Sequence, residues 1–511
     1  MKLAPFILLM TFFLRNNSGA DERHKREDDS SESYSKCYDD IGCIETDSRW
    51  YDKNLRPVNL KPLDRHIIKT DFLLIKPNKS EAGSLLYNSM MANHNSIKSA
   101  GFTRHANVTI LIHDFTGNGY TGWIKHLSVE LLKKSSSINI ISTDWQRGAE
   151  PPYDQAISNA RVVALEILAL LKELKEKFSL KLGHVHIVGH GVGAHIAGYV
   201  GSTYNSIRKI TGLDPSGPRF EGMPNIVKLN PACAKYVEVL HTDAFDSRSQ
   251  GTKEAMGHSD FYLNNAYLQP GCPENTTYDD VTSVARSNLN EGEILPGCSH
   301  KRAFKYFIEA VSSSRCVFLG IKCDSYDDFA KGRCISCNKS DSACRTFGIN
   351  TYKSSVEKTS FYLSSADHTP YCSGKGDHQG YFDFILVDDK ANAAEASVAD
   401  AVSNYRNIAG EAANTFVYYA QPPKIGKIKE AKVRWNEKKK FYCVIYCKQI
   451  INVEKITVKF IGTGNNDEGH ERSLCPVNSD TEIENGAYKT YVSCKSQHHH
   501  STSTASSDTD K

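Results

Sequence analysis

Short apolar segments alternate with longer segments of helical periodicity over the first two thirds of the chain. Residues 108–113 and 138–145 are brief and rich in β-branched side chains, which predicts buried strands. Between Asp154 and Phe178 the apolar positions follow a helical pattern over a longer stretch, which predicts a helix with Asp154 as its cap. Apolar strands that alternate with helices are typical of a mostly parallel sheet covered on both faces, which is an α/β fold.

The segment from Val185 to Gly198 is the most informative part of the sequence. An apolar strand breaks into glycines and restarts as a helix of small residues. A G-x-S-x-G motif works in this setting, because the sharp turn lifts the serine hydroxyl above the edge of the sheet. The flanking glycines Gly189 and Gly193 are present, but Gly191 stands at the middle position. The sequence therefore predicts the turn of a hydrolase without its nucleophile.

Two further apolar segments, residues 209–214 and 236–241, are predicted strands. In such sheets, reactive groups gather beyond the carboxyl ends of the strands, and Asp214 stands at one of these ends. An elbow followed by an aspartate and then by a later histidine is the triad order of α/β-hydrolases. The pattern thus points to an α/β-hydrolase fold with Asp214 as a candidate site residue.

The last part of the chain has a different pattern. Residues 374–380 read as a glycine-rich linker, and alternating strand patterns follow at 381–387, 415–419, 431–435, 441–446 and 455–461. This pattern predicts a C-terminal β-sandwich. Residues 390–414 are rich in alanine, which favours helix, and we expect an inserted helix or a loop there.

Composition narrows the setting in which the chain works. With 511 residues it should divide into two domains, and a formal charge of +3 gives no reason to expect nucleic-acid binding. Residues 1–20 resemble a secretory signal cleaved near Ala20, and no later segment is apolar for long enough to anchor the chain in a membrane. Fifteen cysteines fit an oxidising compartment, so we expect a secreted, extracellular protein.

These observations predict six segments and several modification sites. The segments are a signal peptide at 1–20, a mobile arm at 21–36, the α/β domain at 37–372, a linker at 373–380, the β-sandwich at 381–494 and a disordered tail at 495–511. Four sequons after the predicted signal peptide are compatible with glycosylation, at Asn78, Asn107, Asn275 and Asn338.

Several separated motifs, in the right order, resemble the pancreatic lipase family of secreted neutral lipases. The similar segments are Cys37–Cys43 with Trp50-Tyr51, residues 111–115, residues 143–148, the glycine elbow, residues 210–215 and residues 298–302. The C-terminal sandwich resembles the PLAT domain of that family more loosely. The resemblance implies an α/β-hydrolase fold and an ester-cleaving serine triad.

The resemblance also implies roles for particular residues. Asp214 matches the acid that orients the imidazole, His300 matches the general base, and Gly191 occupies the serine position. The oxyanion-hole donors would be the backbone N–H groups of Phe115 and Val192. Asp114 stands where the family has a glycine beside that hole, and its carboxylate opposes catalysis if it points inward. Alternatively, its side chain faces away. Separately, with Gly191 in place of the serine, His300 could be an ordinary buried histidine that makes ordinary hydrogen bonds.

Further features follow from the resemblance. Residues 272–298 correspond to the family's lid loop, although a solvated surface loop fits their polar content equally well. Implied disulfides are Cys37–Cys43, Cys272–Cys298, Cys323–Cys334, Cys337–Cys344 and Cys475–Cys494; Cys233, Cys316, Cys372, Cys443 and Cys447 have no assigned partner. The positions matching the family's calcium site lack carboxylates, so we expect no metal and no cofactor; they are Asn225, Lys228, Asn230 and Cys233.

We therefore expect a secreted lipase-family protein that lacks hydrolase activity and acts in lipid binding, carriage or storage at a lipid or a lipid–water interface. The alternative is an active triacylglycerol lipase or phospholipase A1 with an unrecognised nucleophile. Residues 424–440 carry eight basic side chains, and we expect a basic strand face with one aromatic residue, Trp435. This face could bind an anionic surface or a sulfated polysaccharide, or form a solvated strand edge. If the rest of the site is preserved, Gly191→Ser should restore esterase activity.

Overall fold

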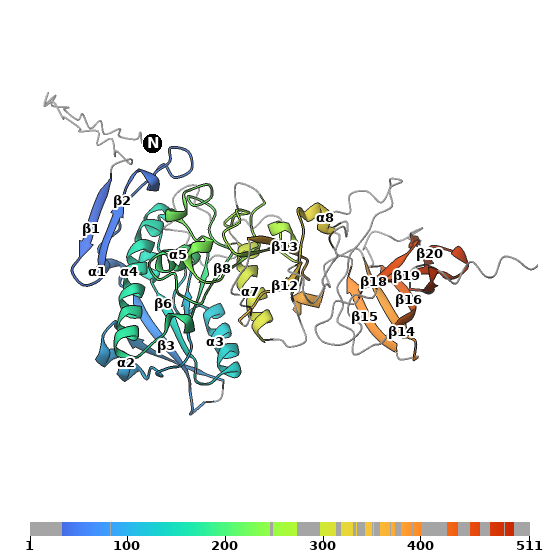
Figure 1. Cartoon of the computed structure of the whole chain (residues 1–511), viewed down its shortest axis with the longest axis horizontal. Helices are drawn as coiled ribbons and strands as arrows, with labels where there is room; N and C mark the ends of the chain where they lie inside the picture. Colours follow the sequence, from blue (N-terminus) through green and yellow to red (C-terminus); the bar gives the residue numbers. More distant parts are fainter. Residues whose placement is uncertain are drawn as a thin grey trace, which may run out of the picture.

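The computed structural model describes the main α/β body and parts of the C-terminal region (Figure 1). The described residues are 33–81, 83–245, 249–272, 297–312, 318–330, 334, 343–349, 351, 358–367, 369–373, 380–390, 393–399, 427–437, 450–459, 471–484 and 486–494. The predicted signal peptide, the C-terminal tail, most of the loop between Cys272 and Cys298, and nearly all of the linker lie outside them.

An eleven-stranded sheet forms the centre of the first domain, in the order β12-β11-β13-β10-β9-β8-β7-β5-β6-β3-β4. Neighbouring strands are parallel from β13 through β10, β9, β8, β7 and β5 to β6. The strands are β3 Asp71–Pro77, β4 Leu85–Met90, β5 Val108–Ile112, β6 Asn139–Asp144, β7 Val185–His190, β8 Lys209–Leu213, β9 Val237–His241, β10 Ser259–Leu263, β11 Leu319–Lys322, β12 Cys344–Thr346 and β13 Thr359–Leu363. The α/β-hydrolase arrangement predicted from the sequence is confirmed.

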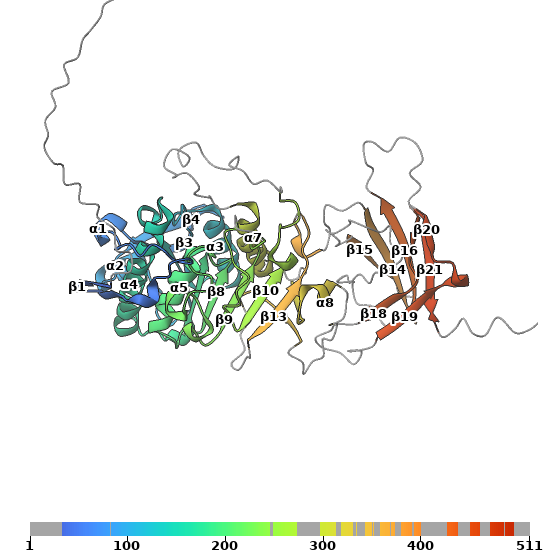
Figure 2. The same cartoon turned by 90° about the horizontal axis from the view of Figure 1, so that it is seen from above.

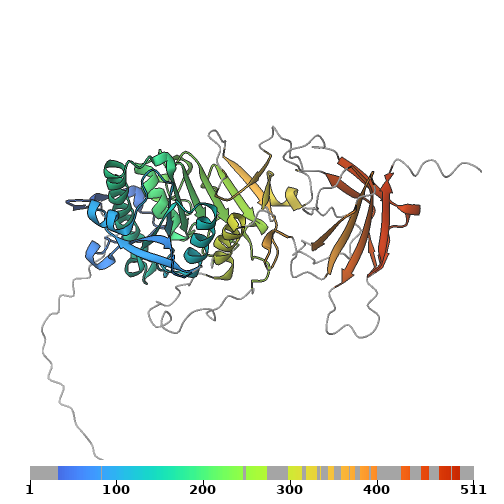
Figure 3. The same cartoon turned by 90° about the horizontal axis from the view of Figure 1, so that it is seen from below.

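Helices cover both faces of this sheet. The α-helices are α1 Arg65–Ile68, α2 His94–Ala100, α3 Gly122–Lys134, α4 Tyr153–Lys177, α5 Val192–Thr203, α7 Cys298–Ser312 and α8 Tyr326–Ala330. The 3-10 turns in this domain are η1 Ser48–Trp50, η2 Gln146–Gly148, η3 Leu182–His184, η4 Asn225–Val227, η5 Pro231–Cys233, η6 Asn264–Ala266 and η7 Tyr371–Ser373. Figures 2 and 3 show α4 and α5 on one side of the sheet, with α3 and α7 on the other.

Each face of the sheet has its own apolar core. Apolar residues of α4 and α5 pack in one cluster with alternate strand residues such as Ile110 and Ile187, whereas α3 and α7 pack in another with Leu111 and Val188. Consecutive residues of a strand point to opposite faces, so a strand covered on both sides must be apolar throughout. This requirement explains why β5 and β7 read as continuous apolar segments.

The predicted helix from Asp154 to Phe178 is α4, but its cap differs from the prediction. Pro152 is the N-cap, and Asp154 lies within the first turn. An aspartate there still interacts favourably with the positive end of the helix dipole. Its carboxylate is also 3.0 Å from Nε of Arg219, so the side chain is used in an ion pair instead of a cap.

The amino-terminal part of the fold begins within the segment that we expected to be a mobile arm. Tyr34–Tyr38 forms β1 and pairs in an antiparallel hairpin with β2, Gly42–Thr46. The register places Cys37 opposite Cys43, and the two are joined by a disulfide. The expected arm boundary at residue 36 is therefore wrong for residues 34–36, because cross-strand pairing orders them.

Besides Cys37–Cys43, three more of the implied disulfides are formed by described cysteines. Disulfides join Cys272 to Cys298, Cys323 to Cys334 and Cys475 to Cys494. Cys344 and Cys372 are also disulfide-bonded, while Cys337 lies outside the described residues. Among the described cysteines, only Cys233 is free; it is buried.

The C-terminal region is an antiparallel six-stranded sheet in the order β15-β14-β16-β21-β19-β18, accompanied by the pair β17-β20, as expected for a β-sandwich. The elements are β14 Gly380–Asp388, β15 Ala393–Ala399, β16 Ile428–Glu437, β17 Ile450–Asn452, β18 Ile456–Lys459, β19 Glu471–Pro476, η8 Val477–Ser479, β20 Glu482–Glu484 and β21 Tyr488–Ser493. The predicted strands at 415–419 and 441–446 lie outside the described residues.

Two expectations for this region are wrong. Part of the alanine-rich segment, residues 393–399, forms β15 and pairs with β14, so the partner strand overrides alanine's preference for helix. Trp435 is 1% exposed and belongs to the core of the sheet, whereas Lys432 is exposed. Since side chains alternate along a strand, Trp435 cannot share the basic face with Lys432.

Within the part of the chain that the structure describes, no helix combines the length and the apolar character needed to span a bilayer.

Candidate active site

The turn between β7 and α5 has the backbone of a nucleophile elbow. Gly191 forms this turn with φ 53° and ψ −118°, a left-handed conformation that favours glycine. Its N–H donates to the carbonyl of Leu213 in the next strand at 3.1 Å. A Cβ at Gly189 or Gly193 would collide with neighbouring backbone, so the flanking glycines are needed for close packing of strand and helix.

Asp214 and His300 meet beside this turn. Asp214 follows β8, His300 lies in the first turn of α7, and both are fully buried. Oδ2 of Asp214 is 2.6 Å from Nδ1 of His300. The other carboxylate oxygen accepts hydrogen bonds from the backbone N–H groups of Thr242 and Asp243, at 2.7 and 3.1 Å. The acid and base positions implied by the sequence therefore form a hydrogen-bonded pair.

Asp114 points into the site. It follows β5, and its Oδ1 accepts a hydrogen bond from the backbone N–H of Val192 at 2.6 Å. Its Oδ2 lies 3.0 Å from Nε2 of His300. One carboxylate therefore engages the predicted oxyanion donor and the predicted general base together.

The loop that carries Asp114 is held by hydrogen bonds behind it. The carbonyl of Asp114 lies 2.8 Å from Nδ1 of His113 and accepts from the N–H of Gly117 at 3.0 Å. Nε2 of His113 accepts from the N–H of Trp145, so its Nδ1 carries the proton and donates to Asp114. His113 is fully buried and stacks on the ring of Trp145. The position of the Asp114 backbone is therefore fixed by the core.

The Asp114 carboxylate occupies the space that a side chain at position 191 would need. A Cβ built on Gly191 has all of its nearest neighbours in that carboxyl group, at separations far below the 3.0 Å minimum of real Cβ contacts. Glycine at 191 and an inward aspartate at 114 are thus sterically complementary. Asp114 lies where a serine side chain would begin.

Electrostatics follow from this three-residue arrangement. Burial disfavours a charged His300, but hydrogen bonds and attraction from Asp114 and Asp214 outweigh this effect and raise its pKa to about 10. Burial likewise disfavours the ionised form of Asp114, yet its interactions with His300 bring its pKa below the ordinary value. At neutral pH, His300 is a cation hydrogen-bonded to two carboxylates.

His190, the last residue of β7, also lies at this site. Its ring centre is 4.4 Å from that of His300, and its Nε2 is 3.2 Å from the His300 carbonyl. Burial, together with repulsion from the His300 charge, lowers the pKa of His190 to about 3. The two neighbouring histidines therefore differ in charge at neutral pH.

Other expected site residues are placed as follows. Phe115 is buried and packs edge-on against Tyr153, with ring centres 5.2 Å apart. Asn107 is exposed and Asn78 is half-buried, whereas Asn275, Asn338 and nearly all of the lid segment lie outside the described residues. Ser202, a hydroxyl near the elbow in sequence, donates to the carbonyl of Gly198 within α5.

The residues at the family's calcium positions make internal contacts. Lys228 is buried and forms an ion pair with Glu254. The side-chain N–H₂ of Asn230 donates to the carbonyls of Asn225 and Lys228, and its oxygen accepts from the N–H of Ala232. Their polar atoms are thus used to shape the loop.

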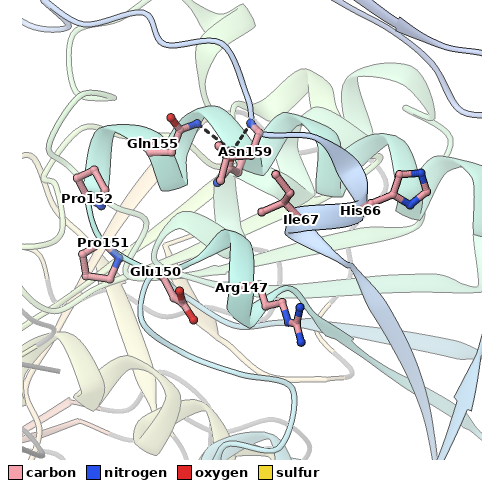
Figure 4. Close-up of a pocket in the computed structure, with 9 residues that line it drawn as sticks. His66, Ile67, Arg147, Glu150, Pro151, Pro152, Gln155 and Asn159 are labelled. Atoms are coloured by element: carbon pink, nitrogen blue, oxygen red, sulfur yellow. Dashed lines mark hydrogen bonds between the residues drawn. The ribbon is translucent and has the colours of Figure 1, made fainter. Parts of the chain in front are cut away.

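A separate open pocket of about 690 Å³ lies beside α1 and the start of α4 (Figure 4). None of the triad positions lines it. Within it, Gln155 donates to the side-chain oxygen of Asn159, which also accepts from the N–H of Leu63. The lining residues are Leu63, His66, Ile67, Arg147, Glu150, Pro151, Pro152, Gln155 and Asn159.

Sequence reasoning treated Asp114 only as an electrostatic liability and assigned no role to His190. The signal for Asp114 was a reciprocal change: an acidic side chain appears where a glycine was expected, and a glycine where a serine was expected. Together these two changes place the side chain at the elbow on residue 114 instead of residue 191. For His190, its place directly before the elbow was the available signal.

The sheet order, the elbow and the Asp214–His300 pair define an α/β-hydrolase fold. The family model described as Lipase matches residues 34–371, so the chain belongs to the Lipase family.

Among its relatives, the inactive pancreatic lipase-related protein 1 of Mus musculus is 31% identical over 343 residues, covering 65% of this chain and 70% of that protein. The pancreatic triacylglycerol lipase of Myocastor coypus is 31% identical over 341 residues, covering 65% of this chain and 72% of that protein. The human inactive pancreatic lipase-related protein 1 is 28% identical and covers 78% of this chain and 86% of that protein. Among solved structures, Est1E from Butyrivibrio proteoclasticus has 17% identity and a TM-score of 0.18, covering 23% of this chain and 43% of that chain.

Proposed function

We propose that this Lipase-family chain does not hydrolyse esters and instead binds or carries lipid outside the cell. The observation that carries the proposal is the pairing of Gly191 with Asp114: one residue has no side chain, and the other fills the resulting space with a carboxylate. Family membership supplies the lipid as the ligand class.

Three requirements of ester cleavage are unmet at this site. An attacking hydroxyl is missing at position 191. The Val192 N–H, which would stabilise the developing oxyanion, already donates to Asp114. Nε2 of His300, the atom that would accept the hydroxyl proton, also contacts that carboxylate. An ester carbonyl placed here would meet a fixed negative charge where its own negative charge must develop.

The alternative is an active triacylglycerol lipase or phospholipase A1, and the intact Asp214–His300 hydrogen bond favours it. It requires a nucleophile other than residue 191. Ser202 bonds its own helix, and Ser216 comes from the loop after Asp214 and is buried. A hydroxyl displaced by an ångström or more loses most of the rate advantage of positioning, so neither is an adequate substitute.

Covalent labelling separates these two functions. The full-length protein is incubated with a fluorescent fluorophosphonate, and turnover of short-chain p-nitrophenyl esters and a triglyceride emulsion is followed in parallel. We expect no labelling and no turnover that depends on His300. A labelled residue mapped by mass spectrometry, with turnover lost in His300→Gln, would establish the active alternative.

Lipid binding needs its own measurement. Protein purified from its natural source is extracted and analysed by mass spectrometry for fatty acid, phospholipid and sterol. We expect stoichiometric lipid, with extract from an unrelated secreted protein of the same preparation as the control. Lipid-free protein that also fails to bind fluorescent fatty acid or phospholipid vesicles would contradict the binding half of the proposal.

The proposal includes no calcium cofactor, because the matching positions lack carboxylates and Lys228 places an ammonium group there.

We also propose that the protein is secreted and glycosylated. A shift in its electrophoretic mobility when protein from culture medium is treated with an endoglycosidase would test this. Binding of the basic segment to an anionic polysaccharide would involve exposed residues such as Lys429 and Lys432. Heparin chromatography of Lys429→Ala/Lys432→Ala against the unmodified protein tests it.

A further inference from the structure

Three buried side chains from separate elements bring metal-ligating atoms together next to the elbow. They are Asp114 after β5, His190 at the end of β7 and His300 in α7, and their ligand atoms all lie within 4.8 Å of one another. Oδ2 of Asp114 is 3.0 Å from Nε2 of His300 and 4.0 Å from Nδ1 of His190. Their side chains are at most 8% exposed.

The hydrogen bonds behind these atoms determine which nitrogen of each ring faces the centre. Nε2 of His190 is 3.2 Å from the His300 carbonyl, which can only accept, so this nitrogen donates. In a neutral ring, Nδ1 then carries a lone pair, and it faces Asp114. Nδ1 of His300 contacts Asp214 at 2.6 Å, which leaves Nε2 for the centre. A carboxylate behind a histidine is the usual partner of a metal-bound imidazole.

The charge of the cluster favours a divalent cation. Asp114 and Asp214 together carry two negative charges, and even a protonated His300 supplies only one positive charge. The remaining negative charge lies in a buried region, where an uncompensated charge is costly. Asp243 adds a further buried carboxylate beside Asp214 and His300. A divalent ion held by Asp114, His190 and His300 would offset this negative charge.

The donor set and its spacing suit zinc. Zinc binds imidazole nitrogen and carboxylate oxygen at about 2.0–2.2 Å, so tetrahedral ligand atoms lie roughly 3.4 Å apart. The distances of 3.0 and 4.0 Å from Asp114 bracket this value. We propose that Asp114, His190 and His300 form a binding site for a divalent transition-metal ion, zinc above all, with Asp214 as a positioning residue. This site goes beyond the proposed lipid-binding function and does not depend on it.

The test uses the full chain carrying alanine at His498, His499 and His500, because that histidine run could bind metal independently. After dialysis against Zn²⁺, we expect close to one zinc per chain by elemental analysis. Cobalt substitution should give the intense visible absorption of a tetrahedral ion. Asp114→Asn and His190→Gln should each weaken binding by at least about tenfold. His186→Gln is the matched control, since His186 lies on the same strand and contacts Thr211 instead.

X-ray absorption of the zinc-loaded, otherwise unmodified site identifies the ligand atoms even if a variant fails to fold. Two imidazole nitrogens and an oxygen around the ion are expected, whereas a sulfur ligand would overturn the assignment. Absence of zinc binding, or equal binding by Asp114→Asn, His190→Gln and the control, would also overturn it. None of these outcomes changes the fluorophosphonate result, so failure of the metal site and failure of the proposed function are distinguishable.

Discussion

The acid–base half of the site and the nucleophile half differ in how closely they match the site of a hydrolase. Asp214 and His300 retain the hydrogen-bonded geometry of a hydrolase, while Gly191 and Asp114 replace the attacking group with a carboxylate. The same imidazole belongs to both halves. Because Asp114 is itself a hydrogen-bond partner for His300, the retained pair has a structural reason to persist. An intact acid–base pair is therefore weak evidence for catalysis.

The largest stability effect is expected in the retained half. Asp214→Ala removes a fully buried carboxylate and leaves two backbone N–H groups and one side of His300 without a partner. Breaking a buried ion pair typically costs about 3–5 kcal/mol of unfolding free energy. Asp114→Ala frees the Val192 N–H and Nε2 of His300. Because His300 keeps its other carboxylate partner, Asp214, this change should cost less, about 1–3 kcal/mol. Urea unfolding of both variants measures the difference, and equal costs would remove the distinction between the halves.

The next largest effect concerns the steric fit between positions 191 and 114. Gly191→Ala adds a Cβ where the Asp114 carboxyl group lies and forces alanine into a left-handed conformation. The strained backbone conformation alone should lower the unfolding free energy by about 1–3 kcal/mol. In an Asp114→Gly background, Gly191→Ala should therefore cost only that amount. In the natural background, the cost should be greater by about 1–3 kcal/mol.

A double-mutant cycle of unfolding free energies measures this coupling. Gly193→Ala serves as the control, since its new Cβ would meet backbone carbonyls of Ile112 and His113 and should not respond to residue 114. Additive costs for positions 191 and 114 would mean that the carboxylate does not fill the space at the elbow.

The smallest expected effect is on the pH dependence of stability. It distinguishes a buried histidine without a carboxylate partner, His195, from His300, which has two. Burial lowers the pKa of His195 to about 3, whereas Asp114 and Asp214 raise that of His300. Since the unfolded chain binds a proton at His195 near pH 6.5 and the folded chain does not, stability is lost as pH falls below that value. The loss approaches about 1.4 kcal/mol per pH unit for this residue.

His195→Gln should reduce the slope of unfolding free energy against pH by up to that amount between about pH 6 and pH 5. Its Nε2 faces the Ser216 carbonyl at 2.9 Å, a contact that glutamine can reproduce in part. Urea unfolding at several pH values provides the slope. An unchanged slope in the variant would show that His195 is not kept neutral by burial.

Much of the fold could be predicted because it depends on local patterns. The strand at 185–190 was recognisable because its apolar residues run directly into closely spaced glycines, which mark a sharp turn before the next helix. The sequence wrongly predicted a helix or a loop for residues 393–399. The helix propensity of alanine is a weak preference, and pairing with β14 determines the strand that forms there. The direction of Trp435 was also missed, although the period of two along β16 determines it.

The site was only half predictable. Asp214 and His300 were identified because their order and neighbouring residues resemble a known motif. The orientation of Asp114 depends on Val192 and His300, which are 78 and 186 residues away in sequence. Only packing of β5, α5 and α7 brings these groups together. A sequence pattern reveals the unusual residue, but the fold determines where its carboxylate points.

Ester turnover by Gly191→Ser, alone and together with Asp114→Gly, tests the central claim most directly. A serine alone must compete with the Asp114 carboxylate for the same space, so we predict p-nitrophenyl ester turnover within about tenfold of the unmodified protein. The double variant frees that space, the Val192 N–H and Nε2 of His300, and should be faster by about a thousandfold or more. Equal activity of the single and double variants, with Gly191→Ser already far above background, would contradict the claim that Asp114 occupies the nucleophile position.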